Sequence, residues 1–549
     1  MTSSPSVTDP ALLPLSAASA LIASRKLSST ELVKACLARI EKYDGQVNAF
    51  VTLTAERALK DAAEADREIA AGRHRGPMHG IPFGLKDIFD TAGVLTTGHS
   101  RILEHNIPSK DATTVSKLCQ AGGVLLGKLA SHEFAHGGPS FDLPWPPARN
   151  PWNDEHIPAG SSSGSAAAIA AGFMPAALGT DTGGSIRSPS SLCGIVGLKP
   201  TYGLVSRAGV IPNSYSLDNC GPMAWTVEDC AILLQVIAGH DAADPGSAQV
   251  AIPDYSAELR SGIKGLRIGV LRHFWEEDSK ANEEAVAAME EALKVLAGLG
   301  AKLSTARMRP VQDYYDTKII IAESELLSVH LHEFMTRPGD FGELFRDHVL
   351  SAMFFSSSDY VEAQRERRRM LAEMEALYRD YDALVTIAPG PAARFDALDS
   401  MSFWKRPSLC TPFNVTSGPA LAQCTGFTSS GLPLAMQVTA RPFDEQTVFR
   451  VAHAFEQATP WRKGRPALSA GAKARPVTSA PVHEHPSPDE TTRQLVSVLA
   501  ARSGLKLNEA QLAHLCLAAP HALAMAARVR KQRARSEEPA STYQAPGAR

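Results

Sequence analysis

The sequence lacks the features that mark secreted and membrane-spanning proteins. Its N-terminus has no basic start followed by an apolar stretch, so we expect no secretory signal. No apolar run reaches the ~18 residues of a membrane span. The eight cysteines are scattered along the chain and include no CxxC pair. They therefore favour buried thiols in the reducing cytoplasm over a disulfide framework.

The chain also lacks an excess of charge of either sign. Lys plus Arg number 55 and Asp plus Glu number 58, which gives a formal net charge of −3. A dedicated nucleic-acid binder would show a basic excess, and an acidic disordered chain would show the reverse. Hydrophobic residues make up 44% and charged residues 21%, as in an ordinary soluble globular protein. We therefore expect neither a nucleic acid nor a membrane as a partner.

Strand and helix patterns alternate through most of residues 75–460 of the 549-residue chain, which predicts one large α/β domain. Ser28 and Glu31 have capping-box spacing and precede an apolar helical face. A short apolar run predicts a buried strand at 123–126. The dense small residues at 166–171 predict a buried helix that neighbouring backbone can approach closely.

The amino-acid composition of the sequence changes towards its C-terminal end. Residues 466–490 are rich in Pro, Ala and Ser without periodicity and predict a linker. Residues 491–549 predict a small all-α domain with amphipathic helices at 491–502 and 508–530, split near Ser503-Gly504 and near Pro520. The main domain is then 1–465. A basic cluster at 528–535 is compatible with an RNA contact, but a solvated helix end is favoured because two glutamates follow directly.

His132, Glu133 and His136 form an HExxH pattern, in which two histidines on a helix can share a zinc ion. The pattern is short and arises easily by chance. Gly-Gly-Pro follows His136 at once, so a helix would stop at the second ligand. Glu155 is the best third ligand available, and it does not follow on a helix. We therefore expect ordinary polar residues here and no metal.

Gly160, Ser162 and Gly164 form a GxSxG pattern, which in an α/β-hydrolase places a nucleophilic serine between a strand and a helix. The preceding stretch is rich in proline and cannot be a central strand. The nearby GTDTGGS run has neither the GxxxxGK[ST] nor the GxGxxG spacing of nucleotide-binding loops. Neither pattern alone therefore assigns a function.

Taken together, three segments resemble the amidase signature family. They are 84–87 (GLKD), 159–167 (AGSSSGSAA) and 179–187 (GTDTGGSIR). Shorter stretches, among them 217–223 (LDNCGPM), also look like that family. The similarity covers roughly residues 10–465, and its long central motifs make it specific. It implies an α/β fold in which helices cover a large central mixed β-sheet.

The resemblance implies a Ser–Ser–Lys catalytic triad. Matched motif by motif, the nucleophile falls on Ser185 and the base on Lys86. The bridging serine, which a cis peptide bond holds in this family, falls on Ser161. Ser162 stays open as the bridge, because two of the family's glycines are replaced here by small residues. The 24-residue offset between Ser161 and Ser185 matches the family's spacing and favours Ser161.

The physical chemistry suits these residue types. A serine hydroxyl is a weak nucleophile until a neighbouring base takes its proton. A lysine can do so only when neutral, so burial or a nearby cation must lower its pKa from about 10.4. Lys86 stands in an apolar run beside Phe83, Leu85 and Ile88, which is compatible with burial. The cis peptide bond comes from the family and not from the residues.

Attack on an amide carbonyl creates an oxyanion, which consecutive backbone N–H groups can stabilise. Glycines allow the backbone to turn towards that oxygen. We expect the oxyanion hole to consist of the N–H groups of Thr182, Gly183, Gly184 and Ser185. The supporting residues behind it are expected to be Asp181, Arg187 and Ser162.

The resemblance implies an amidohydrolase that cleaves a small carboxamide through a seryl acyl-enzyme, releases ammonia or an amine, and needs no cofactor. The expected partners are the small-molecule amide and a second copy of the chain in a homodimer. The alternative is the glutaminase subunit of a tRNA-dependent amidotransferase. Residues 491–549 weakly resemble the small helical subunit that accompanies amidotransferases and biuret-type amidohydrolases. The fusion of this segment to the main domain favours the hydrolase, since the subunits of amidotransferases are normally separate chains.

Overall fold

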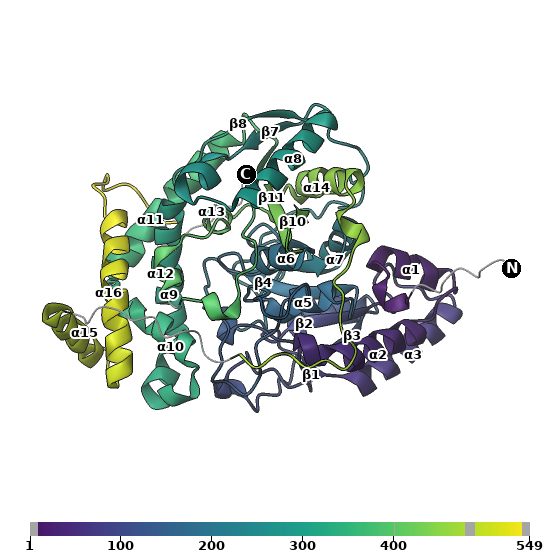
Figure 1. The fold of residues 1–549 in the computed structure, drawn as a ribbon, viewed down its shortest axis with the longest axis horizontal. Coiled ribbons are helices and arrows are strands. Elements are labelled where there is room, and N and C mark those ends of the chain that lie inside the picture. Colours follow the sequence, from purple (N-terminus) through teal and green to yellow (C-terminus); the bar gives the residue numbers. More distant parts are fainter. Residues whose placement is uncertain (1–8, 400, 478–488, 541–549) are drawn as a thin grey trace.

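The computed structural model describes residues 9–399, 401–477 and 489–540, so the centre of the predicted linker lies outside the described residues. Its main feature is a mixed sheet of eleven strands in the order β1-β3-β2-β4-β6-β5-β10-β11-β9-β7-β8 (Figure 1). The strands are β1 Phe50–Leu53, β2 Pro82–Lys86, β3 Val124–Leu129, β4 Ala176–Asp181, β5 Val196–Lys199, β6 Asn219–Ala224, β7 Arg267–Val270, β8 Lys302–Thr305, β9 Ala383–Ile387, β10 Ala420–Phe427 and β11 Pro433–Thr439.

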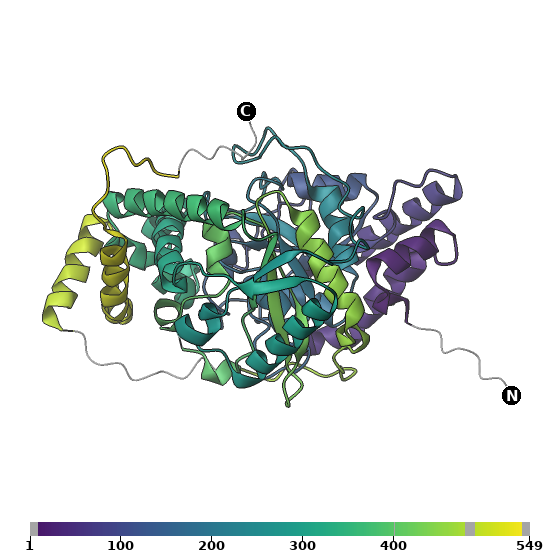
Figure 2. The same cartoon turned by 90° about the horizontal axis from the view of Figure 1, so that it is seen from above.

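Helices surround this sheet, as the family resemblance implied. Figure 2 shows α1–α3 at the opposite end of the molecule from α15 and α16, and Figure 1 agrees. The helices are α1 Leu15–Ala23, α2 Ser29–Val47, α3 Ala55–Ala70, α4 Thr113–Gln120, α5 Ser163–Ala170, α6 Arg187–Cys193, α7 Val227–Ile237, α8 Glu283–Gly298, α9 Val311–Thr336, α10 Glu343–Val349, α11 Ser357–Leu377, α12 Ser402–Lys405, α13 Thr411–Val415, α14 Glu445–Ala458, α15 Glu490–Arg502 and α16 Glu509–Val529.

Local sequence signals predict several of these elements well. Ser28 and Glu31 form the expected capping box at the start of α2. The apolar run at 123–126 belongs to β3, every residue of which is buried. The small-residue stretch at 166–171 belongs to α5, which is buried along its whole length. Because small side chains let α5 pack tightly, it lies inside the domain and contacts β2, β3 and β4.

The sheet topology brings two strand ends together. β2 lies parallel between β3 and β4, and Leu85 is in register with Leu178. Parallel strands present their carboxyl ends at the same edge of a sheet. Lys86 ends β2 and Asp181 ends β4. Two of the predicted site residues therefore meet at one edge.

The C-terminal helices form as predicted, with one correction. The predicted interruption near Pro520 is wrong, because α16 runs through that proline without a break. By length and composition α16 could cross a membrane, but 44% of its most apolar window is buried inside the protein. Its buried residues, such as Leu515 and Met525, join a hydrophobic cluster with α9 and α10. Packing therefore accounts for its apolar composition.

The basic cluster at the end of α16 and just beyond it is partly exposed, as the sequence favoured, but its side chains also pair with acidic residues. Arg528 donates to Asp316 on α9, Nη2 to Oδ1, over 2.8 Å. Arg530 pairs with Asp359 of α11, and Lys531 with a glutamate of the same helix. The cluster therefore holds the C-terminal segment on α9 and α11. Acidic side chains of the main domain thus engage all three cations.

Candidate active site

Lys86 is fully buried at the end of β2, beneath the two serine-rich motifs. Its Nζ donates to Ser161 Oγ over 2.6 Å and to Thr180 Oγ1 over 2.8 Å. Thr180 belongs to β4, the parallel neighbour of β2, so the sheet itself supplies the second partner. The lysine is thus fixed by two hydroxyl groups and faces the first of the predicted catalytic serines.

Burial lowers the pKa of Lys86 to about 7, while the carboxylates of Asp218 and Asp181 act in the opposite direction. Desolvation disfavours the charged ammonium form. It is one of the ways in which a protein keeps a lysine neutral, and so able to act as a base, at neutral pH. A substantial fraction of Lys86 is then the neutral amine near pH 7. That is the protonation state in which the amine can accept a proton from a hydroxyl group.

The structure separates the roles of the two adjacent serines. The Gly160–Ser161 peptide bond is cis, as the family resemblance implied. Ser161 Oγ contacts the Lys86 amine, whereas Ser162 Oγ donates to the carbonyl of Thr180 and accepts from its N–H, both over 3.2 Å. Ser162 therefore ties its loop to β4, and the geometry favours Ser161 as the bridge between Lys86 and the nucleophile.

Ser185 lies on the loop between β4 and α6. Its carbonyl accepts a hydrogen bond from the N–H of Ser162 over 3.1 Å, which places this loop against the cis serine. Ser185 and Gly183 are partly exposed, whereas Lys86 and Ser161 are buried. Ser185 is therefore partly accessible to solvent, whereas Lys86 and Ser161 are not.

A buried ion pair stands behind this loop. Arg187 donates to Asp181 through Nε to Oδ2 and Nη2 to Oδ1, each over 3.0 Å, and both side chains are inaccessible to solvent. Burial works against the charge on Asp181, but the Arg187 guanidinium holds the pKa of that carboxyl well below its usual range. Asn414 and Gln437 add hydrogen bonds to the pair. The expected support for the oxyanion loop is therefore a fully bonded buried network.

One part of the predicted oxyanion hole is wrong in this structure. The N–H of Gly184 donates to Asp181 Oδ1 over 2.7 Å, so it is not available to an oxyanion. Gly184 has a φ of +126°, a conformation that glycine adopts readily. The N–H groups of Gly183 and Ser185 have no acceptor among the described residues. Thr182 is held through its hydroxyl group, which donates to Asp218.

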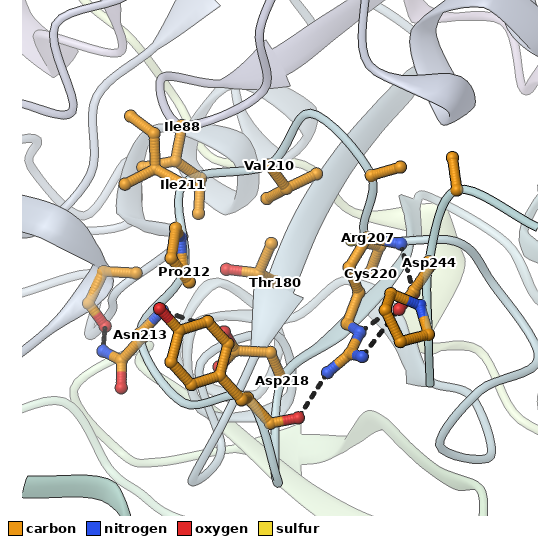
Figure 3. A pocket seen from close by; sticks show the side chains of 15 residues that line it. Ile88, Thr180, Arg207, Val210, Ile211, Pro212, Asn213, Asp218, Cys220 and Asp244 are labelled. Atoms are coloured by element: carbon orange, nitrogen blue, oxygen red, sulfur yellow. Dashed lines mark hydrogen bonds and ion pairs between the residues drawn. The ribbon is translucent and has the colours of Figure 1, made fainter. Parts of the chain in front are cut away.

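A cavity of about 200 Å³ adjoins the other side of Thr180. Figure 3 shows Arg207 and Asp244 paired at one side and Ile88 with Ile211 at the other. Asp218 also lines it. Thr180 is the shared wall between this cavity and the Lys86 amine. Sequence reasoning missed Thr180 and Asp218, although both stand in motifs that carried the family resemblance.

The HExxH residues do not converge on one point. His132 Nδ1 lies 3.2 Å from the carbonyl of Gly137. Glu133 accepts from Ser100 and from the N–H of Gly342. His136 lies beside Glu323 of α9. The described residues contain no group of three or more His, Cys, Asp or Glu side chains that could hold a metal ion.

Comparison with known proteins agrees with this geometry. The family model described as Amidase matches residues 31–449. A curated relative, the A subunit of the glutamyl-tRNA(Gln) amidotransferase of Geobacter metallireducens, is 41% identical over 465 residues, which cover 80% of this chain and 95% of that protein. The chain therefore belongs to the amidase family. It is an enzyme of the amidase-signature type, whose members act on amide C–N bonds and share the Ser–Ser–Lys triad.

Two solved structures are also similar over most of their length. One is described as a vestigial protein complex that reveals the evolutionary origins of an s-triazine catabolic enzyme. It is 33% identical with a TM-score of 0.76, and the match covers 83% of this chain and 100% of that one. The native peptide amidase of Stenotrophomonas maltophilia is 31% identical, with a TM-score of 0.73 and coverage of 83% of this chain and 98% of that one. The helices α15 and α16 follow the region that the family model matches.

Proposed function

We propose that this protein hydrolyses the C–N bond of a small-molecule carboxamide through an acyl-enzyme on Ser185 and releases ammonia or an amine. The observation that carries the proposal is the hydrogen bond from the buried Lys86 amine to Ser161 Oγ. A base with a pKa near the working pH is the most effective kind for moving a proton, and the pKa of Lys86 is lowered to about 7.

In the first half of the proposed reaction, neutral Lys86 takes the proton of Ser161, and Ser161 takes that of Ser185. Ser185 Oγ then forms a bond to the amide carbon, and the carbonyl oxygen becomes an oxyanion. When this intermediate collapses, the C–N bond breaks and Lys86 returns the proton through Ser161 to the leaving nitrogen. The products of this half are the acyl-enzyme and ammonia or an amine.

In the second half a water molecule takes the place of the amine. Lys86 accepts its proton through Ser161, the resulting hydroxide attacks the acyl carbon, and the proton returns to Ser185 as the carboxylic acid leaves. The N–H groups of Gly183 and Ser185 are the proposed oxyanion donors in both halves, with Thr182 beside them. Preorganised donors of this kind each contribute about 3–4 kcal/mol to transition-state stabilisation.

The second candidate is the glutaminase subunit of a tRNA-dependent amidotransferase. Identity of 41% over 95% of one such protein's length supports this candidate better than it supports a free-standing hydrolase. In that case the ammonia would pass to a partner protein that carries charged tRNA, and the expected lack of a nucleic-acid partner would be wrong. The fusion of α15 and α16 to the main domain supports the hydrolase. In that case the partners would be a small amide and a second copy of the chain, and the enzyme would act in the cytoplasm.

Ammonia release by the purified chain separates the two candidates. The assay compares a panel of small amides, including glutamine, and the Ser185→Ala variant serves as the blank. Release from a small amide without any added protein supports the hydrolase. Release that needs an amidotransferase partner and occurs only with glutamine supports the second candidate. Equal release by the wild-type chain and the Ser185→Ala variant would contradict both.

A further inference from the structure

A second lysine lies directly against the proposed oxyanion loop. Lys318 is on α9, and its side chain is 9% exposed. A Cβ atom placed on Gly183 would come within 3.1 Å of Lys318 Cε and 3.8 Å of its Nζ. The absence of a side chain at position 183 therefore allows this ammonium group to approach the loop that carries Ser185.

The ammonium group of Lys318 is under-bonded for a buried cation. Among the described residues only Glu323 accepts a hydrogen bond from it, over 3.5 Å. The ring of Phe403 lies 5.7 Å from Nζ and adds a cation–π contact. An ammonium group has three N–H donors, and a buried charge is costly unless it is paired and fully hydrogen-bonded. Lys318 thus has donors left for a ligand.

The neighbours of Lys318 are polar and incompletely bonded as well. Glu323 is fully buried, and its Oε2 lies 3.2 Å from His136 Nε2, yet neither atom has a hydrogen-bond partner among the described residues. Burial raises the pKa of Glu323 to about 7, so its negative charge is incomplete near neutral pH. This carboxyl group alone therefore does not fully compensate the ammonium group.

We propose, resting on the function proposed above, that Lys318 binds a carboxylate on the amide substrate and so selects amides of short dicarboxylic acids. A carboxylate beside the ammonium group would supply the missing charge-assisted hydrogen bonds. Gly183 and Ser185 are two residues apart, and two residues of chain span at most about 7 Å. The carboxylate therefore stands only a few bonds from the scissile carbonyl, as in malonamate or succinamate.

Binding to the Ser185→Ala variant tests this assignment without turnover. Calorimetry compares malonamate and succinamate with the neutral diamides malonamide and succinamide. We expect the better of the two acids to bind about 10–100-fold more tightly than its diamide, because hydrogen bonds to charged groups are the stronger ones. Adding Lys318→Met should abolish that preference and leave the affinity for the diamide within about threefold.

Lys405→Met is the matched control, because Lys405 is exposed on α12, the helix that carries Phe403. It should leave the preference for the acid unchanged. Lys318→Gln is the second variant and should act like Lys318→Met if the latter fails to fold. Equal affinity of the Ser185→Ala variant for acids and diamides, or an equal loss for both on removing Lys318, would overturn the assignment. Failure of the proposed function would appear separately, as ammonia release that does not depend on Ser185.

Discussion

Lys86 Nζ donates to Ser161 Oγ over 2.6 Å inside the protein, although 75 residues separate the two in the chain. β2 presents the lysine and the loop before α5 presents the serine. Because both side chains are buried, water does not compete for the proton that passes between them. The proposed reaction depends on this contact more than on any other.

Removing the amine should remove the activity. We expect Lys86→Ala to lower kcat for ammonia release by about 10³–10⁴-fold, because general-base assistance contributes on that order. Circular dichroism should show an intact fold, and thermal unfolding measures the cost of the cavity and of the two lost hydrogen bonds to Ser161 and Thr180. A variant with near-normal kcat would exclude Lys86 as the base.

The pH dependence of kcat/KM should report the same group. Burial lowers the pKa of Lys86 to about 7, and only the neutral amine accepts a proton. Activity should therefore fall about tenfold per pH unit below pH 7 and level off above it. Burial raises the pKa of Glu323 to about 7 as well. Glu323→Gln is therefore the control and should keep the same fall in kcat/KM below pH 7. If that fall disappears in Glu323→Gln, the titrating group is Glu323 and not Lys86.

The two neighbouring serines should respond differently to alanine. Ser161→Ala removes the proposed relay, and we expect kcat to fall by about 10²–10⁴-fold. Ser162→Ala leaves the N–H of Thr180 without its acceptor and should lower stability by about 1–3 kcal/mol with a smaller loss of kcat. Steady-state rates and denaturant unfolding of both variants measure the difference. The opposite ranking of the two kcat values would make Ser162 the bridge.

The buried pair behind the loop should matter for stability. Asp181→Asn leaves the Arg187 guanidinium buried without its countercharge, and removing one partner of such a pair costs about 3–5 kcal/mol. The free energy of unfolding in urea should fall by that amount. Activity should fall too, because Asp181 also accepts from the N–H of Gly184 and so shapes the loop. An unfolding free energy equal to that of the wild type would contradict this role.

Docking of the C-terminal segment should depend on Arg533, whose side chain is 1% exposed and pairs with Glu362 and Glu366 of α11. Glu362 keeps Arg365, and Glu366 keeps Arg309 and Lys531, so Arg533→Ala removes only the buried guanidinium and its charge-assisted hydrogen bonds. It should cost about 1.5–3 kcal/mol in unfolding free energy. The control is Arg493→Ala, which breaks an exposed pair with Glu509 and should cost less than about 1 kcal/mol. Similar costs for both variants would show that Arg533 does not anchor the segment.

Much of the fold was readable in the sequence because it rests on local chemistry. The capping box of Ser28 and Glu31, the buried run in β3 and the small-residue helix α5 each form where the sequence predicts them. These signals depend on side chains a few residues apart. The continuity of α16 through Pro520 was not predicted, because the packing of its apolar face on α9 and α10 outweighs the local effect of a proline.

The candidate site divides in the same way. Motif resemblance located Lys86, Ser161 and Ser185, but it left two serines open as the bridge. Only the folded chain distinguishes them, because Ser161 contacts Lys86 while Ser162 bonds to β4. The engagement of the Gly184 N–H by Asp181 was likewise invisible in the sequence.

The sequence by itself determined the family, the α/β class and the residues that carry the chemistry, because long motifs and local patterning are properties of contiguous chain. The tertiary structure alone decided which charges are paired. The basic residues at the end of α16 and just beyond it meet acidic partners on α9 and α11 more than 150 positions earlier, and Lys318 meets Gly183 from a distant helix. Charge pairing depends on distance in space and on burial, and neither is encoded in the spacing of residues along the chain.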